Sequence, residues 1–158
     1  MEKPIKKYKI LVVEDTTVTR NNIVAELREY IKNVEVFTAA TKSRGLQLYN
    51  KNPDIDLAII DLDINSGDDP GHVKSNTELE EQNQGATLND AIGLGLINEI
   101  RSKNKSIILI AFTNSESEAI IDQLNRASAY HHIKRTFTNR QLKLITLVIQ
   151  LLSINKDE

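Results

Sequence analysis

The sequence contains no cysteine among its 158 residues. This absence excludes disulfides, thiolate zinc sites and cysteine nucleophiles, and it fits a protein of a reducing compartment. No apolar run approaches the roughly 18 residues needed to span a bilayer, and residues 1–4 lack the apolar core of a signal peptide. We therefore expect a cytoplasmic protein that is not anchored in a membrane.

A strong excess of one charge is also missing. The 20 Lys and Arg residues nearly balance the 22 Asp and Glu residues, which gives a net charge of −2. Direct nucleic-acid binding is therefore disfavoured, because dedicated nucleic-acid binders are usually strongly basic. At about 100 to 200 residues per domain, the length predicts a single domain spanning 1–158.

Short apolar runs predict the strands of a sheet. They lie at 10–13, 34–37, 55–60 and 107–112, and a shorter, more polar candidate lies at 130–133. In three of them, 10–13, 55–60 and 107–112, apolar residues follow one another rather than alternate with polar ones, which is typical of parallel strands buried on both faces.

Helical patterns lie between these runs. One apolar stripe is formed by Ile23, Val24, Leu27 and Ile31, and similar patterns occur at 40–49 and 92–100. Ser115 with Glu118 and Thr138 with Gln141 have the spacing of capping boxes, so we expect two more helices to begin there. Five strand-helix repeats predict an α/β fold with a doubly wound, open parallel sheet.

The segment 65–90 interrupts this rhythm. Six acidic residues and one lysine give it a local charge of −5, and it contains few apolar side chains. Loops of this length are usually either functional or disordered, and both interpretations remain open. We expect partial order, with a short helix at 77–82.

Polar side chains stand where the predicted strands end. They are Glu14 and Asp15, then Asp61 and Asp63, then Thr113, and finally Lys134. Each has an ordinary structural interpretation as a cap, a turn residue, a loop residue or a solvated surface residue. Ligands of open α/β sheets bind outside the carboxyl ends of the strands, however, so the group as a whole predicts one site.

The chemistry of this group favours a hard cation and phosphoryl transfer. Clustered carboxylates attract Mg²⁺, with Mn²⁺ as a substitute. A carboxylate beside such an ion can attack a phosphoryl group, while an ammonium and a hydroxyl stabilise the charge on its oxygens. Asp61 is the predicted nucleophile because it follows the central, most apolar run.

With these residues in view, the sequence resembles the receiver domains of two-component response regulators. The matching segments are 10–15, 53–61, 107–113 and 133–134. The resemblance implies a flavodoxin-like (βα)₅ fold with strand order 2-1-3-4-5. It also implies that Asp61 is the phosphoacceptor, that Glu14, Asp15, Asp61 and Asp63 hold Mg²⁺, and that Thr113 and Lys134 bind the phosphoryl group. The segment 65–90 would then be an acidic insertion after the third strand.

The implied function is that of a stand-alone phosphoacceptor. A histidine kinase or phosphotransfer protein would donate the phosphoryl group, and signalling would follow from altered protein-protein interactions. Four positions depart from the family pattern. His131 stands where receivers carry a switching Tyr or Phe, Asn65 and Arg135 replace common prolines, and Asn114 is larger than the residue that usually follows the threonine. The alternative is therefore a pseudo-receiver, an interaction module that works without phosphorylation.

Two other chemistries are weaker. His131 and His132 could be read as a zinc pair, but adjacent strand residues point to opposite faces. The order of Asp61, Asp63 and Thr113 also resembles haloacid-dehalogenase-type phosphatases. That family needs an acidic pair after the lysine, whereas here the pair Glu14–Asp15 precedes Asp61. We therefore expect no enzyme activity beyond the protein's own phosphotransfer and dephosphorylation.

The last predicted helix is unusually apolar. Between 142 and 154 its apolar positions cover an arc of about 240°, while packing on a sheet needs a stripe of about 100°. We expect the excess to be buried against a partner or a second copy. In receivers the face formed by the fourth helix, fifth strand and fifth helix is a common dimerisation surface.

Overall fold

The computed structural model describes residues 4–65, 67, 90–115, 117–133 and 140–156. A parallel sheet of five strands has the order β2-β1-β3-β4-β5. The strands are β1 (Tyr8–Val13), β2 (Val34–Ala39), β3 (Leu57–Asp61), β4 (Ile108–Thr113) and β5 (Tyr130–Ile133). The predicted α/β fold and strand order are confirmed, including the short, polar strand at 130–133.

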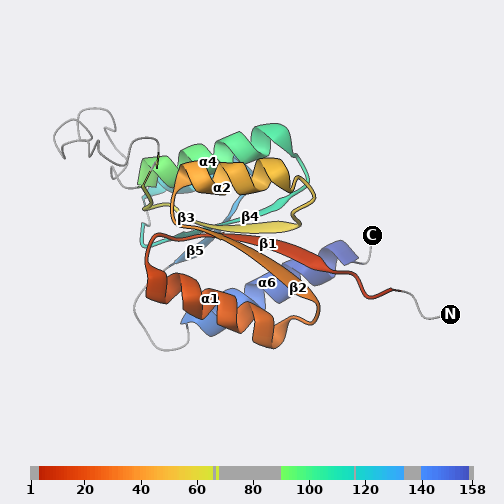
Figure 1. Cartoon of the computed structure of the whole chain (residues 1–158). Helices are drawn as coiled ribbons and strands as arrows, with labels where there is room; N and C mark the ends of the chain where they lie inside the picture. The colour runs from red at the N-terminus through yellow and green to blue at the C-terminus, as the bar shows by residue number, and fades with distance from the viewer. Residues whose placement is uncertain (1–3, 66, 68–89, 116, 134–139, 157–158) are drawn as a thin grey trace.

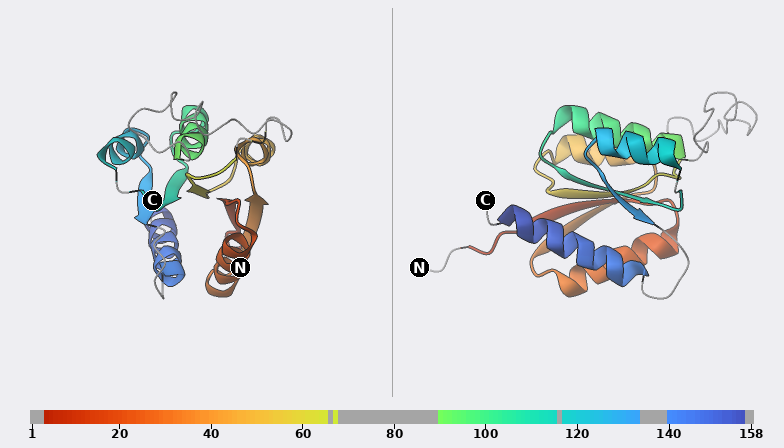
Figure 2. Two further views of the ribbon diagram at one scale, coloured as in Figure 1. Left: turned by 90° about the vertical axis from the view of Figure 1, so that its left-hand side faces the viewer. Right: turned by 180° about the vertical axis from the view of Figure 1, so that it is seen from behind.

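Helices cover both faces of this sheet (Figure 1). One face is covered by α1 (Thr17–Tyr30) and α6 (Arg140–Lys156). The other is covered by α2 (Lys42–Lys51), α4 (Asp90–Lys103) and α5 (Glu118–Arg126), as the view from behind also shows (Figure 2). The helices predicted from periodicity are all present, with ends displaced by a few residues.

Two hydrophobic cores lie on opposite faces of the sheet, because successive strand residues point to opposite sides. In β1, Ile10 and Val12 belong to the core under α1 and α6. Leu11 and Val13 belong to the core under α2, α4 and α5. All five residues of β3 are buried, as the unbroken apolar run predicts for a central strand.

The apolar excess on α6 is mostly covered within the chain itself. Its buried residues are Leu144, Ile145, Val148, Leu151 and Leu152. The helix packs against α1 as well as the sheet (Figure 2), so it buries a wider arc than a helix on a sheet alone. Among the described side chains of α6, Ile149 is the large apolar one that stays exposed, at 39%.

The predicted start of α5 is wrong by two residues. Its N-cap is Ser117, and the helix begins at Glu118. Ser115 makes other bonds: its N–H donates to Thr113 Oγ1 at 3.0 Å, and its Oγ accepts from the N–H of Ser117 at 3.3 Å. The hydroxyl is therefore used inside the loop. For α6, which begins at Arg140, the predicted cap Thr138 lies outside the described residues.

Most of the predicted insertion 65–90 also lies outside the described residues, including the expected helix at 77–82. Its first residue is anchored, since the N–H of Lys42 donates to the carbonyl of Asn65 at 2.9 Å. Its last residue, Asp90, begins α4. In the parts of the chain that are described, no helix has the length and apolar character needed to cross a membrane.

Replacing Glu26 on α1 with glutamine should raise the free energy of unfolding at pH 7. Burial raises the pKa of this carboxyl above its ordinary 4.5, and the charge of Glu29 raises it further. The Oε2 atom is buried and accepts no hydrogen bond within the described residues. A raised folded-state pKa in an acid destabilises the fold above that pKa, and the penalty disappears as pH falls below the unfolded value.

The gain should be below about 1 kcal/mol, because the half-buried side chain is partly screened by water. Urea unfolding at pH 7 and pH 4 would measure it. The advantage of Glu26→Gln should shrink at the lower pH, and the exposed Glu29→Gln should give a smaller change. An equal gain at both values would show that the charge on Glu26 is not responsible.

Candidate functional site

Three carboxylates meet at the carboxyl end of the sheet. Glu14 and Asp15 follow β1, and Asp61 ends β3. The pairing of Val13 with Ile60 sets these strand ends beside each other. One carboxylate oxygen from each residue lies within 4.8 Å of the others. Glu14 and Asp61 are each 1% exposed, whereas Asp15 is exposed to solvent.

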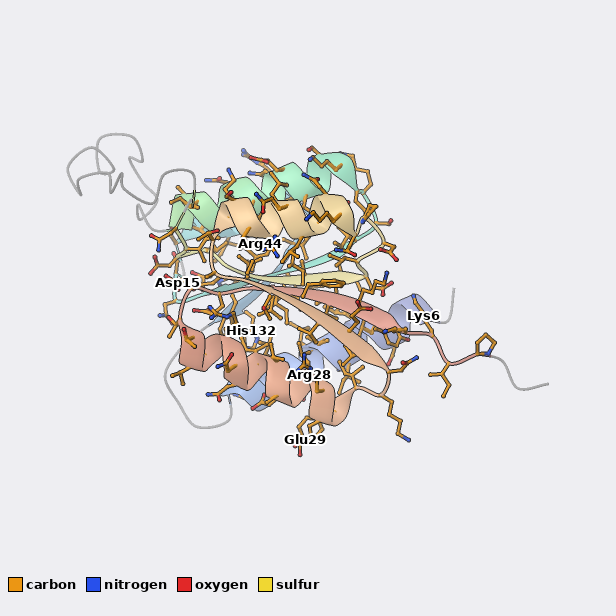
Figure 3. All side chains as sticks on the ribbon, viewed as in Figure 1. Lys6, Asp15, Arg28, Glu29, Arg44 and His132 are labelled. Atoms are coloured by element: carbon orange, nitrogen blue, oxygen red, sulfur yellow. The ribbon has the colours of Figure 1, made fainter. Side chains whose placement is uncertain are left out.

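The turn after β1 is held by hydrogen bonds on both sides of Glu14. Its N–H donates to the carbonyl of Ala39 at 2.9 Å, which extends the pairing with β2. Its Oε1 accepts from the N–H of Thr16 at 3.1 Å. Its carbonyl accepts from Arg20 Nη1 at 2.7 Å. Asp15 lies at the carboxyl end of the strands, and Lys6 lies at the opposite end, as the labelled side chains show (Figure 3).

The turn after β3 orients the carboxyl of Asp61. The N–H of Asp63 donates to Asp61 Oδ1 at 3.0 Å. Leu62 between them is fully buried and donates its N–H to the carbonyl of Phe112 at 3.3 Å. The side chain of Asp63 is exposed. The family resemblance places Asp63 among the Mg²⁺ ligands, and in the structure Asp63 lies two residues after Asp61 with its backbone bonded to the Asp61 carboxylate.

Thr113 stands on the neighbouring strand. Asp61 pairs with Phe112 across β3 and β4, so Thr113 ends β4 one residue beyond this pair. It is 2% exposed. Two hydrogen bonds connect Thr113 through Ser115 to His131, the residue at the predicted switch position. The N–H of Ser115 donates to Thr113 Oγ1, and Nε2 of His131 lies 2.9 Å from the Ser115 carbonyl oxygen. Since a carbonyl only accepts, Nε2 carries the proton.

The two adjacent histidines of β5 point to different faces. His131 is half-buried on the side of Ser115, whereas the ring of His132 stacks on Phe112 with centroids 5.7 Å apart. The zinc pair considered from the sequence is therefore not assembled by these side chains. Lys134, predicted to bind the phosphoryl group, lies outside the described residues, as does Arg135.

The carboxylate cluster fits a small hard cation. An octahedral Mg²⁺ with oxygens at about 2.1 Å places its ligands about 3 to 4.2 Å apart, so oxygens within 4.8 Å need only small side-chain adjustments to share one ion. An all-oxygen set suits Mg²⁺ or Mn²⁺ better than a thiophilic metal. Glu14, Asp15 and Asp61 would hold the ion directly.

Sequence reasoning missed two residues that support the site. Arg20 bonds to the main chain of Glu14, and it occupies the beginning of a helix, where a cation is disfavoured by the helix dipole. A basic residue at the start of a predicted helix was therefore the sequence signal that could have identified Arg20. Gly93 of α4 approaches the turn after β3 closely enough for its N–H to donate to the Leu62 carbonyl at 3.1 Å. A glycine inside a helix often marks such an approach.

Comparison with known proteins gives the same fold from solved structures. A response regulator receiver domain protein (CheY-like) from Methanospirillum hungatei superposes with a TM-score of 0.67 at 20% identity, covering 97% of this chain and 100% of that one. The chemotaxis response regulator CheY4 of Vibrio cholerae gives 0.63 at 19% identity over 90% and 99%. A response regulator from Thermotoga maritima gives 0.63 at 18% identity over 94% and 99%.

No protein-family profile matches the sequence. No curated protein matches it either. At identities of 18–20% the structural similarity establishes the fold of this chain. Its function has to be inferred from the residues of the site. The five-stranded parallel sheet in the order 2-1-3-4-5 has the fold of these response regulator receiver domains.

Proposed function

We propose that this chain is a phosphoacceptor receiver that takes a phosphoryl group onto Asp61 from a histidine kinase or phosphotransfer protein. The observation that carries the proposal is the cluster of Glu14, Asp15 and Asp61, with the phosphoacceptor candidate buried on the central strand. Thr113 at the end of the adjacent strand supports it.

The proposed step is an in-line displacement at phosphorus. A carboxylate oxygen of Asp61 forms the new P–O bond, the P–N bond to the donor histidine breaks, and the histidine nitrogen leaves with the bonding electrons and takes up a proton. Bound Mg²⁺ would neutralise charge on the carboxylates and the phosphoryl oxygens. The N–H of Asp63 holds Asp61 Oδ1 in place, which lowers the entropic cost of attack. The hydroxyl of Thr113 and the ammonium of Lys134 would stabilise the transferred group.

Mass spectrometry of the intact protein tests this directly. With Mg²⁺ and a small phosphodonor such as acetyl phosphate, the wild type should gain the mass of one phosphoryl group. Asp61→Asn should gain none, because an amide is not a nucleophile here. Asp122→Asn, on the exposed surface of α5, should be modified like the wild type. An unmodified wild type that also fails to bind Mg²⁺ would refute the proposal.

The output we propose is altered protein binding in the cytoplasm, without direct contact with nucleic acid or membrane. Beyond its own phosphotransfer and dephosphorylation, we propose no enzyme activity. We propose homodimerisation through α5, β5 and α6. Two large apolar side chains of this face support it: Tyr130 on β5 is 47% exposed, and Ile149 on α6 is 39% exposed.

One observation favours the alternative of a pseudo-receiver. His131 is bonded to the Ser115 carbonyl, and this bond opposes movement of the ring at the position where receivers switch. Sedimentation with and without the phosphoryl mimic beryllofluoride separates the alternatives. A receiver should change its oligomeric state or its affinity for a partner when the mimic binds, whereas a passive module should not.

A further inference from the structure

The turn after β1 brings two carboxylates toward a third, an arrangement that their mutual repulsion opposes. The cluster spans 4.8 Å, and Glu14 within it is almost completely buried. Like charges at this separation repel each other, so the backbone that carries them must be held in place by other contacts. What holds the turn at Glu14 is therefore relevant to the metal site.

Arg20 makes the connection that spans this turn. Its Nη1 donates to the Glu14 carbonyl at 2.7 Å, a charge-assisted bond across six residues. Its Nη2 lies 3.5 Å from Thr17 Oγ1, and its N–H makes a helical bond to the Thr16 carbonyl at 2.9 Å. Arg20 thus connects Glu14, which follows β1, to the first helical turn of α1.

The energetics of the helix do not explain this arginine. The first turn of α1 contains no acidic residue, and its N-cap Thr16 makes no side-chain capping bond. A cation at a helix N-terminus is weakly disfavoured, so the helix dipole gives no reason for an arginine there. The contact observed is with the main chain of a residue in the carboxylate cluster.

We propose that Arg20 is a positioning residue for the metal site: by holding the Glu14 carbonyl, it fixes the turn that presents the carboxylates of Glu14 and Asp15 to Asp61. The proposal rests on the proposed function, since it takes the cluster to be a Mg²⁺ site. Residues that orient metal ligands typically change metal affinity by about 10 to 100-fold when removed.

Binding of Mg²⁺ alone, measured by isothermal titration calorimetry, gives two opposite expectations. If Arg20 acted only through its charge, Arg20→Ala would bind Mg²⁺ more tightly, because a nearby positive charge would be gone. If Arg20 positions the turn, Arg20→Ala should bind about tenfold more weakly. Arg20→Lys keeps a donor and the charge and should recover part of the affinity.

Arg28→Ala is the matched control, because Arg28 is exposed in the last turn of the same helix, well away from Asp15 (Figure 3). It should bind Mg²⁺ like the wild type. Circular dichroism verifies that each variant is folded. If Arg20→Ala does not fold, the test uses Arg20→Lys, which should bind Mg²⁺ more weakly than the wild type. Equal or tighter binding by the folded Arg20 variants would overturn the positioning role. A wild type that binds no Mg²⁺ would instead contradict the proposed function.

Discussion

Asp61→Asn should stabilise the metal-free protein by about 1 to 2 kcal/mol. Two unit charges at the upper separation of 4.8 Å repel by about 3.5 kcal/mol at an effective dielectric constant of 20, and Asp61 faces two such neighbours. Local relaxation and the positive charge of Arg20 reduce the net effect. Asparagine keeps an oxygen that can accept the hydrogen bond from the N–H of Asp63, so the turn after β3 is retained.

Mg²⁺ should reverse this order of stability. Saturating the wild type at about 100 times its dissociation constant adds about 2.7 kcal/mol through binding to the folded state. The variant has lost one of three carboxylate ligands and should gain much less. Urea unfolding in EDTA and in Mg²⁺ measures both effects.

Asp122→Asn is the control, because this exposed carboxylate of α5 lies outside the cluster and its removal should leave both free energies within about 0.5 kcal/mol of the wild type. If Asp61→Asn is less stable than the wild type in EDTA, repulsion among the carboxylates does not dominate this site. If it responds to Mg²⁺ like the wild type, Asp61 is not a ligand.

The sheet and the acidic edge could be predicted from the sequence because each follows from local pattern. The apolar run at 55–60, which supplies all of β3 except Asp61, is typical of a strand buried on both faces of a covered parallel sheet. Parallel strands end at the same edge, so Glu14, Asp15 and Asp61 meet there without knowledge of any contact.

Contacts between elements distant in sequence could not be predicted in this way. The apolar arc on α6 is wider than packing on a sheet requires, which suggested a partner protein. In the structure α1 also packs against α6 and buries part of this arc, and the sequence pattern does not reveal that contact. Ser115 had the spacing of a cap, but its N–H bonds to Thr113 and the helix begins two residues later. For α6 a tertiary contact outweighed the sequence pattern, and at Ser115 the local bonds of the loop did so.

Gly93→Ala should destabilise the protein by about 2 kcal/mol, although alanine is the better helix former by about 1 kcal/mol. A Cβ at Gly93 would lie 2.3 Å from Leu62 Cα and 2.6 Å from the Asp61 carbonyl oxygen. These are backbone atoms that cannot rotate away, so α4 or the turn after β3 must shift. The turn carries Asp61, and Mg²⁺ affinity should therefore fall together with stability.

Gly95→Ala in the same helix is the matched control. The Cβ would lie 3.0 Å from Lys42 Nζ, which is the far end of a flexible side chain. Helix propensity should then dominate, so this variant should be more stable by up to about 1 kcal/mol and should bind Mg²⁺ normally. Chemical denaturation and calorimetry on both variants measure the contrast. The same sign of stability change for Gly93 and Gly95 would contradict a close approach of α4 to the turn that carries Asp61.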